Sequence, residues 1–110
     1  MTTPFDLKIK VAPEHIDALG HVNNVVYVQW MQDVATAHID ALGLGIEQYL
    51  ELKHAMVAVA HHVQYRKACF LDEEIILRTW LSDLNAMYSF RQYVFYRPSD
   101  QTILFVASTK

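Results

Sequence analysis

The chain has 110 residues, of which 53% are hydrophobic and 19% are charged, a composition typical of one globular domain and not of a disordered chain. Its net charge of −3 argues against a nucleic-acid partner, because binding a phosphate backbone requires a basic face.

The first predicted element is a strand at Phe5–Val11, where apolar and polar residues alternate. A long helix is predicted from about Asn24, because polar residues recur at spacings of three and four through the apolar run that follows. Its wide apolar surface must be covered on most sides. Gly43 and Gly45 are suited to the left-handed turn that ends a helix, and a short second helix is predicted within residues 46–54.

Four strands are predicted in the second half of the chain. Alternation with period two covers Ala55–Lys67 and recurs in residues 73–82, 87–97 and 102–110, with turn residues at 83–86 and 97–101. This order of elements predicts a single α+β domain over residues 1–110, with an antiparallel five-stranded sheet. The last strand pattern stops at Lys110 without turn residues, so we expect the chain to be a truncated form of a longer one.

Three features of the sequence bear on its location. Cys69 is the single cysteine, which excludes an intrachain disulfide and favours a reducing compartment. The first ten residues lack the basic and apolar segments of a secretion signal. No apolar run reaches the roughly 18 residues that span a bilayer. We therefore expect a cytoplasmic protein without membrane insertion.

Polar and ionisable residues are concentrated directly before the predicted helix, in residues 15–27 (HIDALGHVNNVVY). Asn23 is a good N-cap, which would place the unpaired amides of the first helical turn, including that of Asn24, next to this loop. These amides and the helix dipole favour negative charge, so they are suited to binding an oxyanion that develops during a reaction. Gly20 permits a tight backbone path that returns Asp17 towards them. The alternative is purely structural, since Asp, Gly and Asn are common in turns and caps.

The same stretch resembles the active-site signature of the 4-hydroxybenzoyl-CoA thioesterase-like group of hotdog acyl-CoA thioesterases. That signature has an aspartate, two residues, a glycine, a histidine, a hydrophobic residue, two asparagines and then a tyrosine. The matching residues here are Asp17, Gly20, His21, Val22, Asn23, Asn24 and Tyr27. The resemblance continues more weakly through Trp30 and residues 32–36, and again in residues 63–79.

Two departures from the family pattern are visible. Thr36 follows Ala35 where such proteins commonly have an arginine, which leaves the substrate class open, including the choice between an aliphatic and an aromatic acyl group. Members also usually extend beyond the point that corresponds to Lys110.

The resemblance implies a hotdog fold, in which the sheet wraps around a long central helix, and an acyl-CoA thioesterase activity. Asp17 would attack the thioester or activate water, while His21 and Asn23 would hold the loop and orient the carboxylate or its water. Asn24 would supply the oxyanion amide, and Tyr27 would lie near the acyl pocket. No cofactor is expected, and no metal site, because His15 and His21 lack a further ligand.

Basic residues of the predicted strands are candidates for contact with CoA phosphates: Arg66, Lys67, Arg91 and Arg97. The predicted substrate contacts are Gly20, Tyr27, Arg66 and Lys67.

Three alternatives to an acyl-CoA thioesterase stay open. The chain could act on an acyl carrier protein, or it could be a non-catalytic acyl-binding hotdog module. A hydratase-type hotdog enzyme fits poorly, because such enzymes resembling this fold carry their carboxylate on the helix and Asp17 precedes it.

Self-association is expected from the surplus of apolar surface on so small a domain and from the resemblance. Hotdog domains generally pair edge strands over two helices, with each active site at the subunit boundary. The predicted edge strand is Ala55–Lys67, so that Arg66 or Lys67 would reach a CoA held mainly by the partner. A homodimer is the minimum assembly, and a homotetramer is the alternative.

Overall fold

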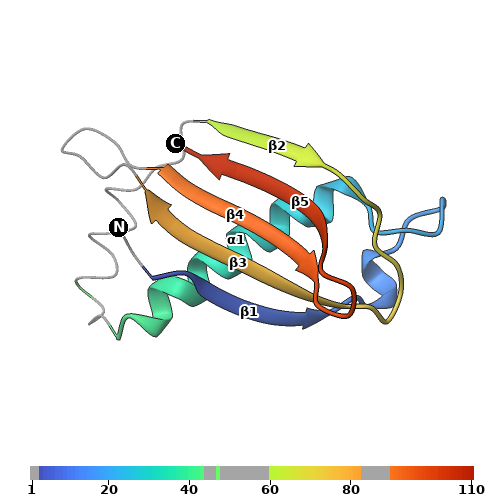
Figure 1. The fold of residues 1–110 in the computed structure, drawn as a ribbon, viewed down its shortest axis with the longest axis horizontal. Coiled ribbons are helices and arrows are strands. Elements are labelled where there is room, and N and C mark those ends of the chain that lie inside the picture. The colour runs from blue at the N-terminus through green and yellow to red at the C-terminus, as the bar shows by residue number, and fades with distance from the viewer. Residues whose placement is uncertain (1–2, 44–46, 48–59, 83–89) are drawn as a thin grey trace.

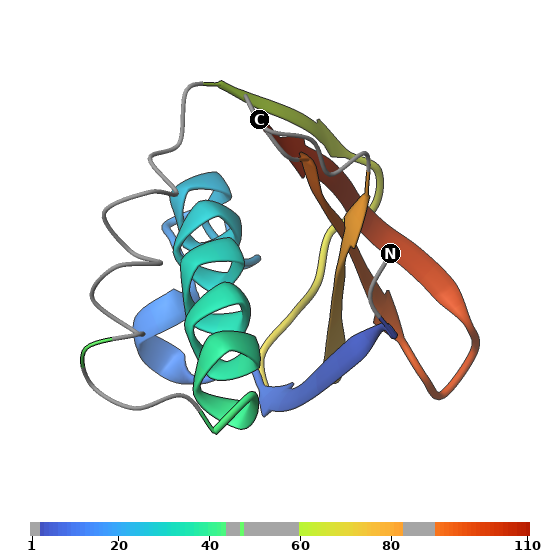
Figure 2. The ribbon, with the colours of Figure 1, turned by 90° about the vertical axis from the view of Figure 1, so that its left-hand side faces the viewer.

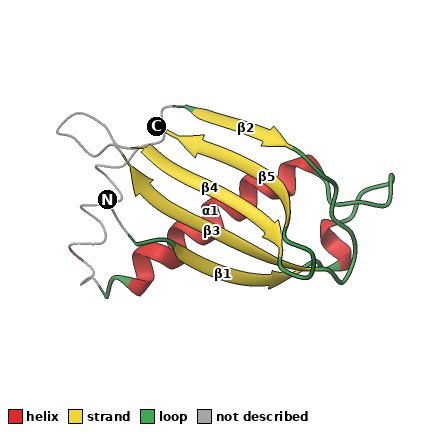
Figure 3. Cartoon of the chain, viewed as in Figure 1, coloured by secondary structure: helices red, strands yellow, loops and turns green. Residues whose placement is uncertain are grey.

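The structure is a computed structural model that describes residues 3–43, 47, 60–82 and 90–110. Within these residues the elements in chain order are strand β1 (Phe5–Lys10), 3₁₀-helix η1 (Pro13–His15), helix α1 (Asn24–Ala41), and strands β2 (His61–Tyr65), β3 (Glu74–Ser82), β4 (Phe90–Arg97) and β5 (Thr102–Thr109). Figure 1 shows one sheet with α1 lying across a single face, and Figure 3 shows how loops connect these elements.

The five strands form one antiparallel sheet in the order β1-β3-β4-β5-β2. Strand β2 therefore lies at one edge and β1 at the other. The sheet curves around one side of α1, as Figure 2 shows when the molecule is turned by 90°. In β1 the burial alternates, with Phe5, Leu7 and Ile9 partly buried against the core and the intervening residues exposed. This confirms the alternation expected of a strand with one buried face.

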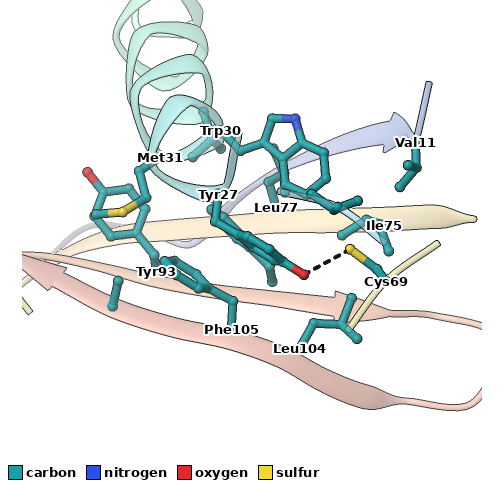
Figure 4. Packing of buried hydrophobic residues seen from close by; sticks show 14 residues of the cluster. Val11, Tyr27, Trp30, Met31, Cys69, Ile75, Leu77, Tyr93, Leu104 and Phe105 are labelled. Atoms are coloured by element: carbon teal, nitrogen blue, oxygen red, sulfur yellow. Dashed lines mark hydrogen bonds between the residues drawn. The ribbon is translucent and has the colours of Figure 1, made fainter. Parts of the chain in front are cut away.

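The core lies between α1 and the sheet (Figure 4). Tyr27, Trp30, Met31 and Val34 are the apolar residues that α1 buries. Tyr27 stacks on Phe105, with ring centroids 5.1 Å apart, and Phe105 in turn stacks on Phe95 at 4.9 Å. Such aromatic pairs contribute beyond the area that they bury, so this stack fixes the first half of the helix on strands β4 and β5.

Both ends of α1 follow the sequence signals. Asn23 is the N-cap, and its side-chain oxygen accepts a hydrogen bond from the Val25 amide at 2.9 Å. Gly43 has φ +69°, the left-handed conformation that commonly follows a helix. The expected cover of the helix is incomplete in the described part of the chain, because the side chains of Val25 and Leu42 are 74% and 56% exposed.

The hotdog fold predicted from the sequence is confirmed: a five-stranded antiparallel sheet around one long helix. The strand predicted at Ala55–Lys67 is present as β2 and lies at a sheet edge, although its first part, residues 55–59, lies outside the described residues. The second helix, apart from Glu47, and the turn at 83–86 also lie outside them. Among the described residues, no helix is long and apolar enough to cross a membrane.

Candidate active site

The loop before α1 is folded tightly on itself. Ile16 and Val22 form an isolated antiparallel bridge, and the Asp17 amide donates to the His21 carbonyl oxygen at 3.1 Å. The Gly20 amide donates to the Asp17 carbonyl oxygen at 3.1 Å. Gly20 has φ +85°, a conformation that glycine adopts without the Cβ penalty of other residues. The glycine predicted to allow a tight turn therefore does so.

The Asp17 side chain lies in this turn, half-buried. Its Oδ1 accepts a hydrogen bond from the Leu19 amide at 2.9 Å. Within the described part of the chain, Oδ2 has no hydrogen-bond partner. One carboxylate oxygen is thus used to shape the turn, and the other is free to accept from water or substrate.

The first turn of α1 follows directly. The Asn23 amide donates to the His15 carbonyl oxygen at 3.0 Å, and the Val26 amide donates to the Asn23 carbonyl oxygen at 3.0 Å. The Val25 amide is taken by the Asn23 side chain. The Asn24 amide has no hydrogen-bond partner among the described residues. It is therefore a free donor at the positive end of the helix dipole.

A cleft of about 140 Å³ lies between this first turn and the end of strand β2. The predicted site residues that line it are His21, Asn24, Tyr27, Arg66 and Lys67. The cleft thus brings Asn24, at the start of α1, together with Arg66 and Lys67, which follow strand β2. Arg66 Nη2 also donates to Oε1 of Gln64 at 3.3 Å. Its described lining contains no acidic residue, so its electrostatics favour an anionic ligand.

Tyr27 and Cys69 meet beneath the cleft. The Tyr27 hydroxyl and Cys69 Sγ are 3.1 Å apart, the contact dashed in Figure 4, and both residues are buried. Burial, followed by this contact, raises the pKa of Tyr27, and burial raises the pKa of Cys69. Both groups are therefore neutral at physiological pH, and the buried thiol has none of the thiolate character of a nucleophile.

Three predicted site residues do not line the cleft: Asp17, Gly20 and Asn23. They lie in the adjoining loop and cap, which the hydrogen bonds described above join to His21 and Val25. His21 itself lines the cleft, and its ring meets Phe70 edge to face at 6.5 Å. The motif residues are thus of two kinds. His21, Asn24 and Tyr27 line the cleft, whereas Asp17, Gly20 and Asn23 lie in the adjoining loop and cap.

Two of the four basic candidates for CoA contact were wrong. Arg91 is only 7% exposed, and its Nη1 donates to Nδ1 of His38 at 2.9 Å, near the far end of α1. Arg97 forms ion pairs with Glu73 at 2.7 Å and with Asp100 at 3.0 Å. Strand alternation directs Arg91 into the core, and nearby carboxylates occupy Arg97, so neither guanidinium is available at the cleft.

Tyr65 lines the cleft but was not predicted as a site residue. Its hydroxyl donates to the Asn24 carbonyl oxygen at 3.2 Å. The signal in the sequence was its position at the end of an edge strand, directly before Arg66 and Lys67.

Comparisons with known proteins identify the family of this chain. The model of the thioesterase-like superfamily matches residues 11–110. YneP of Bacillus subtilis, named an acyl-CoA thioesterase, is 27% identical over 95 residues, which are 86% of this chain and 68% of YneP.

Solved structures share the fold. Slr0204 from Synechocystis, a 1,4-dihydroxy-2-naphthoyl-CoA thioesterase, superposes with a TM-score of 0.83 at 12% identity, over 97% of this chain and 79% of its own. A mutant 4-hydroxybenzoyl-CoA thioesterase complexed with 4-hydroxybenzoyl-CoA superposes with a TM-score of 0.84 at 11% identity, over 96% of this chain and 80% of its own. The family match covers nearly the whole chain and includes both walls of the cleft. The chain therefore belongs to the thioesterase-like superfamily, and the predicted enzyme class, a thioesterase, is confirmed.

Proposed function

We propose that the chain hydrolyses acyl-CoA thioesters to free CoA and a carboxylic acid at the cleft between α1 and β2. The observation that carries this proposal is the meeting of the free Asn24 amide with Arg66 and Lys67 in one cleft. A CoA thioester carries a polarisable carbonyl at one end and phosphates at the other, which match a helix N-terminus and a basic strand end.

Asp17 is the proposed nucleophile or general base. As a base, it takes a proton from water while the water oxygen bonds to the carbonyl carbon, and the carbonyl oxygen becomes an oxyanion next to the Asn24 amide. Collapse then breaks the C–S bond, and the CoA thiolate takes up the proton. As a nucleophile, an Asp17 oxygen bonds to the carbonyl carbon, and the C–S bond breaks to release the CoA thiolate. Water then hydrolyses the mixed anhydride to free Asp17 and the carboxylic acid, and the thiolate takes up the proton that this step releases. In both routes the free oxygen of Asp17 reacts, and the oxyanion donor contributes roughly 10²–10³ in rate.

His21 and Asn23 are proposed to support this chemistry. The His21 carbonyl oxygen and the Asp17 amide close the turn, so His21 helps to fix where the carboxylate lies. Asn23 caps the helix through the Val25 amide and leaves the Asn24 amide free. Gly20 permits the turn, and Tyr27 forms the cleft floor against Cys69.

A release assay for free CoA with acetyl, medium-chain, long-chain and aromatic acyl-CoAs tests this function. We expect catalytic release from at least one class. Hydrolysis of an acyl carrier protein thioester with no release from any acyl-CoA would favour the carrier-protein alternative. Binding of acyl-CoA without turnover would favour the non-catalytic module and contradict the proposal.

The assembly proposed is a homodimer or homotetramer of a cytoplasmic enzyme, built on the edge strand β2. Strand β2 ends at Tyr65, directly before the basic residues of the cleft, so a second copy paired along this edge would lie beside the site. Exposed apolar residues in the first turn of α1 and at its C-cap, Val25 and Leu42, support association. Light scattering at micromolar concentration, combined with the release assay, tests this: a stable and active monomer would contradict it.

A further inference from the structure

Tyr65 connects the two walls of the cleft. Its hydroxyl donates to the Asn24 carbonyl oxygen, at 3.2 Å, on the first turn of α1. Its ring meets Tyr27 edge to face at 5.4 Å and Phe105 at 5.2 Å. Because Tyr65 is the last residue of β2, this one side chain joins the helix to the strand end that continues into Arg66 and Lys67.

The backbone on the strand side is fixed by β5. Tyr65 pairs with Phe105 in the antiparallel register, and the amides of Arg66 and Lys67 both donate to the Leu104 carbonyl oxygen, at 2.9 and 3.2 Å. The basic residues therefore have a defined backbone position in the sheet. The hydrogen bond from the Tyr65 hydroxyl to the Asn24 carbonyl oxygen then links this backbone to the first turn of α1.

We propose that Tyr65 is a positioning residue of the thioesterase reaction, which sets the separation between the Asn24 amide and the Arg66–Lys67 pair. This inference rests on the proposed function, in which a CoA thioester occupies both places at once. Phosphates bound at the basic residues hold the thioester end of the same molecule near the helix, so the separation of the two places affects how the carbonyl is presented to the Asn24 amide. Tyr65 is 42% exposed and is not one of the buried core residues. Its hydroxyl bonds to the Asn24 carbonyl oxygen, so its removal takes away a contact between the two walls of the cleft.

The test compares two substrates with the same acyl group. One is the acyl-CoA that the enzyme hydrolyses best, and the other is the matching N-acetylcysteamine thioester, which has no phosphates. For Tyr65→Phe we expect kcat/KM to fall about tenfold with acyl-CoA, the size of one lost hydrogen bond, and less than about threefold with the truncated thioester. A structural defect would lower both values equally.

Tyr96→Phe is the matched control. Tyr96 lies on β4, and its hydroxyl accepts a hydrogen bond from Arg78 at 3.5 Å, away from the cleft lining. This variant also loses one tyrosine hydroxyl and should hydrolyse both substrates as the wild type does. When Lys67 is already replaced by alanine, Tyr65→Phe should lower kcat/KM for acyl-CoA much less than it does in the wild type. The reason is that Lys67, one of the groups whose distance from the Asn24 amide Tyr65 is proposed to set, is then absent.

The outcomes are distinct. Equal losses with both substrates, or a Tyr65→Phe enzyme that behaves as Tyr96→Phe does, would overturn the role of Tyr65 and leave the proposed function intact. A wild-type enzyme that hydrolyses no acyl-CoA would overturn both. A loss confined to the acyl-CoA substrate and reduced by Lys67→Ala would support the positioning role.

Discussion

At its first turn, helix α1 leaves polar groups open to a ligand, whereas near its last turn the polar groups are buried and bound to one another. Asn24 lines a cleft, and its amide has no partner in the described part of the chain. His38 and Arg91, by contrast, are 6% and 7% exposed and share a hydrogen bond of 2.9 Å. The same helix therefore leaves a backbone donor open at one end, and near the other end it carries a side-chain acceptor that is already paired with Arg91.

The cluster at the far end is defined by its chemistry. Arginine has donors only, so Nδ1 of His38 must accept from Arg91 and its proton lies on Nε2. Arg91 also donates to the Thr79 hydroxyl at 3.2 Å, and Phe5 stacks on the His38 ring at 5.1 Å. Burial, followed by the charge of Arg91, lowers the pKa of His38. Substitutions near the first turn of α1 should therefore lower activity, whereas substitutions near its last turn should lower stability.

The largest expected effect comes from the loop at the open end. Asp17→Asn should lower kcat by about two orders of magnitude or more, because a general base or nucleophile is lost, while the fold remains intact. Asp40→Asn is the matched control, since Asp40 is exposed in the last turn of α1. Steady-state kinetics and thermal unfolding check both. Turnover of Asp17→Asn within about threefold of the wild type would remove Asp17 from the mechanism.

The next effect is on stability at the closed end. His38→Leu leaves the Arg91 donor without this acceptor and should lower the free energy of unfolding by about 1–3 kcal/mol. Activity per folded molecule should not change, because the cluster does not line the cleft. Urea denaturation and the release assay measure the two quantities. A large loss of kcat/KM at unchanged stability would contradict the claim that the last turn of α1 serves stability and not activity.

The pH dependence sharpens this prediction. The pKa of His38 is lowered in the folded protein from an unfolded value of about 6.5, so protonation favours the unfolded chain. The stability that neutral His38 contributes is present above about pH 6.5 and is lost as the pH falls below it. Arg91, which contacts His38, and Thr79, which contacts Arg91, do not change charge in this range, because a guanidinium stays protonated and a hydroxyl stays neutral. The unfolding free energy of the wild type should therefore decrease more steeply between about pH 7 and 5 than that of His38→Leu. Parallel curves would contradict this.

The smallest effects are expected at two glycines with positive φ, one before α1 and one after it. Gly20 (φ +85°) lies in the Asp17 turn, and Gly43 (φ +69°) follows the helix. Neither has an atom within 4 Å of an added Cβ, so alanine is opposed by backbone strain and not by a clash. Each alanine variant should cost about 1 kcal/mol of stability. We expect only Gly20→Ala to lower kcat/KM as well. Equal kinetics in the two variants would show that the turn does not position Asp17.

The sequence predicted the fold well because its signals are local. Alternation in residues 5–10 and 74–82, the cap at Asn23 and the glycine at 43 each follow from a short stretch of chain, and the structure confirms them. Of the motif in residues 17–27, His21, Asn24 and Tyr27 are among the residues that line the cleft.

What the sequence could not predict depends on contacts between distant segments. Arg91 and Arg66 look alike as basic strand residues, and only the sheet order and strand register direct Arg91 inward to His38. The contact of Tyr65 with Asn24 joins residues 41 positions apart, and no periodicity reports such a pair. Asp17 and Asn23 belong to the turn and the cap that adjoin the cleft, and the backbone hydrogen bonds that place them there cannot be read from the motif.

The most direct test of the account is a crystal structure with a non-hydrolysable thioester analogue of the preferred acyl-CoA. The account predicts that the carbonyl oxygen lies within about 3.2 Å of the Asn24 amide nitrogen, with the CoA phosphates at Arg66 and Lys67. A carbonyl that faces the strands, or phosphates bound away from this pair, would contradict the open helix end as the site of the reaction.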